Sequence, residues 1–127
     1  MKLNEQVTSL ELSRKLKKLG VKQESLWYWK SRSYLGVVRS ILVEGIPELK
    51  NRAGFFSAFT VAELINMMSK SNRALRFTTI VNYTGDAWYI PPVANYPHFR
   101  GKTQADAFAK MLCYLIENNL FKKEGEQ

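Results

Sequence analysis

The sequence predicts an α+β domain in which helices and strands follow the order α-β-β-α-β-β-α. Three segments repeat apolar residues at the spacing of an amphipathic helix, and each begins with a threonine followed three positions later by an acidic residue. The segments between them are short and rich in aromatic and β-branched residues, which is typical of strands. We therefore expect one antiparallel sheet of about four strands, with three helices packed mainly on one face.

The three predicted helices cover about residues 9–19, 61–69 and 104–118. In each, the threonine hydroxyl can accept a hydrogen bond from the amide of the third helical residue. The expected cap pairs are Thr8 with Glu11, Thr60 with Glu63, and Thr103 with Asp106. Gly20 follows the first helix, where a residue in the left-handed conformation commonly ends a helix.

The four predicted strands cover residues 26–29, 34–43, 76–83 and 88–90. The last two form a hairpin, because the residues between them are turn-like. Two prolines follow the fourth strand and end it, since proline has no N–H to donate to a neighbouring strand. The two remaining segments, 44–57 and 91–101, are predicted to be loops.

The length of 127 residues is typical of one domain, and we expect residues 1–121 to form it, followed by a frayed polar tail at 122–127. The first residues lack the apolar run of a signal peptide, and no stretch approaches the roughly 18 apolar residues of a membrane span. Cys113 is the single cysteine, so no disulfide forms within the chain. These features predict a cytoplasmic protein without a membrane partner.

Residues that carry chemistry are sparse, and the sequence predicts neither a catalytic site nor a metal site nor a cofactor. His98 and Cys113 stand alone, whereas structural zinc needs four ligands. Cys113 lies on the apolar side of the third predicted helix, where a buried structural thiol is expected. Glu63 and Asp106 are explained by capping, and no glycine-rich phosphate loop is present. We therefore expect a protein that is not an enzyme.

Three blocks of the chain share their order with a known group of proteins. They are LELS, LGVKQES and WYW within residues 10–29, FTVAEL at 59–64, and ADA, AKML and YLIEN within 105–118. Together they resemble small uncharacterised proteins encoded in phages, prophages and related mobile elements of gut bacteria. The blocks are cap, core and helix signals, so the resemblance implies an origin and carries over no catalytic residue.

Positive charge is concentrated between residues 14 and 52, which hold ten Lys and Arg against three Glu, so this segment carries 10 − 3 = +7 of the net charge of +8. An uneven basic field attracts anions, and nucleic acid is the commonest such partner. The candidate nucleic-acid-binding residues are Arg14, Lys18, Lys22, Lys30, Arg32 and Arg39. The alternative is a solvated surface that only keeps the protein soluble.

Consecutive aromatic residues suggest a different function, that of a protein-interaction module. Trp27, Tyr28 and Trp29 cannot all face one side of a strand. Exposed Trp and Tyr are favoured anchors at protein interfaces, although loops could also bury these rings. The candidate partner-binding residues are Trp27, Trp29, Trp88, Tyr89, Tyr96 and Phe99. The partner would be an unknown protein or a second copy of the chain. We take protein interaction as the first hypothesis, because the nucleic-acid hypothesis rests on charge alone.

Overall fold

The computed structural model describes residues 2–46, 48, 52–71, 79–81, 85–92 and 97–121. Its helices are α1 (Leu3–Gln6), α2 (Leu10–Lys18), α3 (Val61–Ser71) and α4 (Gln104–Glu117). Its strands are β1 (Trp27–Tyr34), β2 (Val37–Glu44), β3 (Phe55–Ala58), β4 (Ile80–Val81), β5 (Trp88–Ile90) and β6 (Phe99–Gly101). The predicted tail at 122–127 lies outside the described residues.

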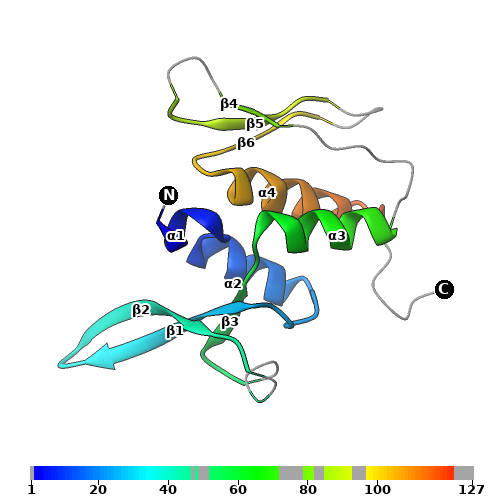
Figure 1. Ribbon diagram of the computed structural model, residues 1–127. Helices are drawn as coiled ribbons and strands as arrows, with labels where there is room; N and C mark the ends of the chain where they lie inside the picture. The colour runs from blue at the N-terminus through cyan, green and yellow to red at the C-terminus, as the bar shows by residue number, and fades with distance from the viewer. Residues whose placement is uncertain are drawn as a thin grey trace.

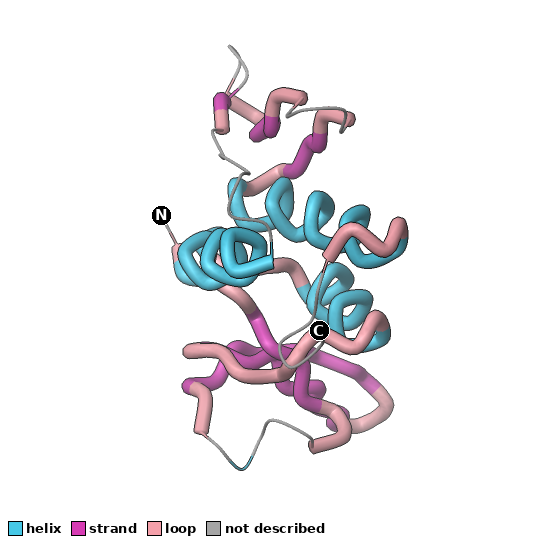
Figure 2. Tube along the Cα trace, turned by 90° about the vertical axis from the view of Figure 1, so that its right-hand side faces the viewer, coloured by secondary structure: helices cyan, strands magenta, loops and turns pink. Residues whose placement is uncertain are grey.

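The helices lie between two antiparallel sheets, as Figures 1 and 2 show. One sheet has the strand order β2-β1-β3 and the other the order β4-β5-β6. The α+β class is therefore confirmed, and β4 pairs antiparallel with β5 as the predicted hairpin requires; residues 76–78 and 82–84 of that hairpin lie outside the described residues. The prediction of a single sheet with the helices mainly on one face is wrong, because β3 and β6 lie in segments predicted to be loops and each completes a separate sheet.

The main hydrophobic core lies in the helical layer and includes Ile90 of β5, while Tyr28 and Ala58 are buried residues of the other sheet. Helix α4 packs against β5 and β6 on one side and against α3 and α2 on the other, while α2 also contacts β3. The largest fully buried side chains of this core include Phe59, Leu64, Met68, Phe108 and Leu112. Burial of a large apolar side chain stabilises a fold by about 1.5–3 kcal/mol, which explains why the helical layer can support two small sheets.

Two of the three predicted threonine caps are confirmed. The amide of Glu63 donates to Thr60 Oγ1 at 3.2 Å, and the Thr60 amide donates back to Glu63 Oε1 at 2.9 Å, which completes a capping box at α3. At α4, the Asp106 amide donates to Thr103 Oγ1 at 3.1 Å. These local bonds satisfy amides that a helix start leaves unpaired.

The third predicted cap is wrong, because Ser9 and not Thr8 caps α2. Ser9 Oγ accepts from the Leu12 amide at 3.3 Å. The buried Thr8 hydroxyl instead accepts from the Phe59 amide at 3.1 Å and lies 2.7 Å from Ser13 Oγ. A distant segment therefore competes for the threonine and shifts the helix start by one residue.

Strands β1 and β2 form a long hairpin whose tip extends beyond the helical layer (Figure 1). The sequence predicts one strand from residue 34 to 43, but the chain turns at Leu35 and Gly36, with φ values of 50° and 78°. Two successive residues with positive φ are typical of a type I′ hairpin turn, which matches the twist of the flanking strands. Leu35 is 86% exposed at this tip.

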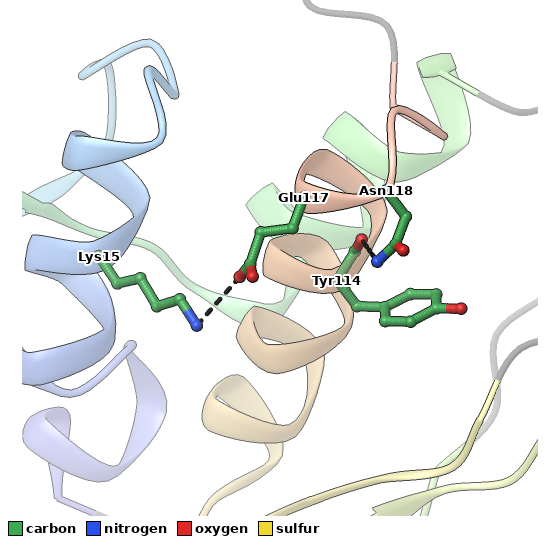
Figure 3. Close-up of polar contacts among 4 residues, drawn as sticks. All are labelled: Lys15, Tyr114, Glu117 and Asn118. Atoms are coloured by element: carbon green, nitrogen blue, oxygen red, sulfur yellow. Dashed lines mark hydrogen bonds and ion pairs between the residues drawn. The ribbon is translucent and has the colours of Figure 1, made fainter.

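Polar contacts also hold α2 against α4. Lys15 Nζ lies 3.0 Å from Glu117 Oε1 (Figure 3), and this bond raises the pKa of Lys15 above its ordinary value. At the other end of α2, the Ser9 amide donates to Asp106 Oδ1 at 2.8 Å. Burial raises the pKa of the Asp106 carboxyl, and the hydrogen bond from Ser9 opposes that rise. Both contacts fix the orientation of α2, and therefore the direction of its outward cations.

Candidate nucleic-acid interface

The edge strand β3 places two phenylalanine rings on opposite sides of one sheet. Phe55 pairs with Lys30 of β1 in the strand register, and Phe56 pairs with Trp29. Successive side chains of a strand point to opposite faces, so Phe56 lies on the side of α2 and Phe55 on the other side. Both rings are half-buried.

Four cations lie over these two rings. Arg14 Cζ and Lys17 Nζ of α2 lie 5.4 Å and 5.1 Å from the centroid of the Phe56 ring. Lys30 Nζ and Arg52 Cζ lie 5.7 Å and 5.5 Å from the centroid of the Phe55 ring. A cation within about 6 Å of a ring centroid is attracted by the ring quadrupole. We call these six residues the β3 cation cluster: Arg14, Lys17, Lys30, Arg52, Phe55 and Phe56.

Within the described ranges, no ion pair joins a carboxylate to a cation of the β3 cation cluster. Lys17 Nζ donates to the carbonyl oxygens of Phe55 at 2.9 Å and Arg52 at 3.1 Å, but a carbonyl carries no net charge. Ion pairs among the described residues join Lys15 to Glu117 and Lys22 to Glu24, and none of them involves a cluster cation. The cluster is therefore a concentrated positive site whose side chains are already held in place by ring and carbonyl contacts.

The structure brings together only some of the predicted basic residues. Arg14 and Lys30 belong to the β3 cation cluster, and the exposed Lys18 lies one helical turn after Arg14. Lys22 is held by Glu24 at 3.4 Å. Arg39 is exposed on β2, opposite Arg32 in the strand register. The side chain of Arg32 is not among those that the structure describes.

Lys17 and Arg52 are not among the predicted site residues. Both owe their positions to β3, most of which lies in the predicted loop 44–57. The sequence signal that could have indicated this site is the pair Phe55 and Phe56 three residues after Arg52, since aromatic rings attract neighbouring cations.

The candidate partner-binding aromatics are mostly engaged in packing. Trp27, Trp29, Trp88, Tyr89 and Phe99 are all half-buried. Trp29 Nε1 donates to the Thr8 carbonyl at 2.8 Å, and Trp88 and Phe99 pack against the core. Tyr89 lies under Arg100, whose Cζ is 5.5 Å from the ring centroid. Tyr96 lies outside the described residues.

Groups that could carry catalysis lie apart from one another. Cys113 is buried in α4, and desolvation raises the pKa of its thiol to about 11, which makes it a poor nucleophile at neutral pH. His98 is exposed, with its ring centroid 6.5 Å from that of Tyr89. The described residues contain no group of three or more His, Cys, Asp or Glu arranged to hold a metal ion.

A shallow pocket of about 210 Å³ lies between α3 and the segment after α2. Its lining mixes both signs of charge, with Lys22 and Lys70 beside Glu24 and Glu63. Pockets that bury a small molecule usually have about 300–1,000 Å³ and mostly apolar walls. Size and lining therefore argue against this pocket as a small-molecule site.

No protein-family model, curated protein or solved structure matches the chain. The resemblance to phage and prophage proteins therefore stays a prediction. Each helix within the described ranges is too short or too polar to cross a bilayer.

Proposed function

We propose that this protein binds nucleic acid through the β3 cation cluster. The observation that carries the proposal is the grouping of four cations around two rings of an edge strand, without a carboxylate among the described ion pairs at any of them. Phosphate contacts from Lys and Arg supply nearly all of the free energy of non-specific nucleic-acid binding.

The contacts within the cluster favour binding because they restrict the cations before a ligand arrives. Immobilising a flexible side chain on binding costs about 0.5–1.5 kcal/mol. Lys17 is already anchored to two carbonyls and a ring, yet an ammonium has three N–H donors and can give the third to a phosphate. The two arginines, Arg14 and Arg52, are exposed and present guanidinium groups that match phosphate geometry.

The expected binding is non-specific in sequence. The cluster lies on α2, β1, β3 and the residue Arg52 just before β3, and charge contacts to phosphate orient a protein on nucleic acid without reading the bases. Four neutralised phosphates give a slope of about −3.6 for log K against log salt on duplex DNA and about −2.8 on single strands. Between about 50 and 200 mM salt, duplex affinity should therefore fall about 150-fold.

A titration of fluorescently labelled single-stranded and duplex oligonucleotides at these two salt concentrations tests the proposal. We expect anisotropy to rise at the lower salt with a Kd of about 10⁻⁶ to 10⁻⁴ M, and to change little at the higher salt. Oligonucleotides of two unrelated sequences should bind alike. Absence of binding to either form at low salt would reject the proposed function.

A protein-interaction function, the first hypothesis from the sequence, is favoured by a separate part of the molecule. Among the described side chains of the β1–β2 hairpin, two apolar ones are exposed: Leu35 at 86% and Ile41 at 38%. These residues, rather than the half-buried tryptophans, are the apolar surface that a protein partner could cover.

A further inference from the structure

The outer edge of β2 presents unpaired backbone groups to its surroundings. β2 is the terminal strand of the order β2-β1-β3, and it is eight residues long. In the part of the chain that the structure describes, no backbone hydrogen bond outside the sheet pairing involves a residue of β2. A long edge strand of this kind is a template for pairing with another strand.

The opposite edge of the same sheet is blocked. Lys17 Nζ binds the outward carbonyl of Phe55 at 2.9 Å, and Gln23 Oε1 accepts from the Ser57 amide at 2.8 Å. Just beyond β3, Thr8 pairs with Phe59 through its amide at 2.9 Å and its hydroxyl at 3.1 Å. Of the two edges, only β2 can accept a further strand.

The register of the hairpin determines which groups of β2 point outward. Tyr34 and Val37 flank the two-residue turn as partners, and beyond the other end of β2 the Gly45 amide donates to the Leu26 carbonyl at 2.7 Å. Odd-numbered residues of β2 therefore bond to β1, because the pairing alternates along an antiparallel strand. The outward amides and carbonyls belong to even-numbered residues, among them Ser40 and Leu42.

From this alternation we propose that β2 pairs antiparallel with β2 of a second copy of the chain, about a two-fold axis at Ile41. Outward groups meet only when even-numbered residues face even-numbered residues. Centring the axis on Ile41 places Ser40 opposite Leu42 of the second copy and Val38 opposite Glu44, so β2 pairs over most of its length. The result is a continuous six-stranded sheet.

Side chains and charges suit this register. Ile41 meets its own counterpart on the axis, so its 38% exposed surface becomes covered by an identical apolar side chain. Arg39 faces Val43 of the second copy. The two Arg39 residues then lie four positions apart, about 13 Å along the strands at a rise of about 3.4 Å per residue. That distance exceeds the Debye length of about 8 Å at physiological salt, so their repulsion is screened.

The same geometry relates the dimer to nucleic-acid binding. A two-fold axis perpendicular to the sheet keeps equivalent faces of the two copies on the same side. Lys30 and Arg52 of one copy therefore face the same direction as those of the other, and two binding modules joined in this way gain affinity through effective concentration. The dimer depends only on the outer edge of β2 and does not require nucleic-acid binding.

Cysteine cross-linking tests the register. In an Ile41→Cys variant, the cysteines of the two copies face each other as a non-hydrogen-bonded pair. Their Cα atoms lie about 4.5 Å apart, within the range that a disulfide bridges. The control variant Val43→Cys places its thiols about 13 Å apart in the proposed register. Native Cys113 is buried and contributes no cross-link.

With oxidised glutathione, we expect the Ile41→Cys chain to form a covalent dimer at least tenfold faster than the Val43→Cys chain. Equal rates for the two variants, or faster cross-linking of Val43→Cys, would overturn the register. Sedimentation of the unmodified chain provides a second readout. It should show a dimer that Ser40→Pro abolishes, because proline removes an outward N–H that the hairpin itself does not use. The far-UV circular dichroism of Ser40→Pro should match that of the unmodified chain. A monomeric unmodified chain at all concentrations up to about 100 times that of the cross-linking assay would overturn the dimer.

Discussion

The Gly101→Ala variant is expected to lose about 3 kcal/mol of unfolding free energy. A methyl group at Gly101 would lie 2.4 Å from the amide nitrogen of Ala107 and 2.8 Å from the carbonyl carbon of Asp106. Both are backbone atoms of the first turns of α4, so no side chain can rotate to make room. The strand β6 and the helix α4 would have to separate, which opens the core beneath them. Urea unfolding followed by circular dichroism measures the loss.

The adjacent substitution Lys102→Ala is the matched control. Lys102 is exposed, and its truncation should change the unfolding free energy by less than about 0.5 kcal/mol. If Gly101→Ala were as stable as the control, the close approach of β6 to α4 would be wrong.

Neutralising all four cations of the β3 cation cluster should remove most of the salt dependence of nucleic-acid binding. In the variant Arg14→Gln, Lys17→Gln, Lys30→Gln and Arg52→Gln, each lost cation lowers the slope by about 1. Because four phosphates together contribute a slope of about −3.6, we expect duplex affinity at about 50 mM salt to fall by at least 100-fold. The measurement is the same anisotropy titration, repeated over a series of salt concentrations.

The control for this variant removes the same net charge elsewhere. Lys2, Lys70, Lys102 and Lys110 are exposed and lie outside the β3 cation cluster. Their joint replacement by glutamine should lower affinity by less than about tenfold, because only the general field of the protein changes. Equal losses in the two variants would show that net charge, and not the cluster, governs binding.

Local signals in the sequence predict the helices well. The capping box of Thr60 and Glu63 forms as expected because both partners lie within one turn of α3. Thr8 shows the limit of such reasoning. Its neighbour Ser9 can also cap, and the choice between them depends on the Phe59 amide, which lies about fifty positions away along the chain.

Strand pairing could not be predicted in the same way. Phe55–Ala58 is only four residues long and is a strand because it pairs with β1. Phe99–Gly101 is likewise a strand because β5 lies beside it. Neither segment has enough residues to show an alternation of its own, so the chain was expected to form one sheet and forms two.

In the candidate site, too, local features could be predicted and contacts between distant segments could not. Arg14 and Lys30 could be identified from the basic segment, since charge is visible in the sequence. Lys17 and Arg52 could not, because their roles depend on β3 folding against α2. Lys15 belongs to the same basic segment but is neutralised by Glu117, a contact that only the tertiary structure creates, whereas Lys22 pairs with Glu24 only two positions along the chain.

Acetylation footprinting of lysines is the most direct test of where nucleic acid binds. The chain is acetylated with and without a saturating single-stranded oligonucleotide at low salt, and mass spectrometry then compares each site. We predict that Lys30 and Lys17 become several-fold less reactive while Lys70 and Lys102 stay unchanged. Protection of Lys70 and Lys102, with Lys30 and Lys17 unaffected, would contradict the assignment of the β3 cation cluster as the nucleic-acid interface.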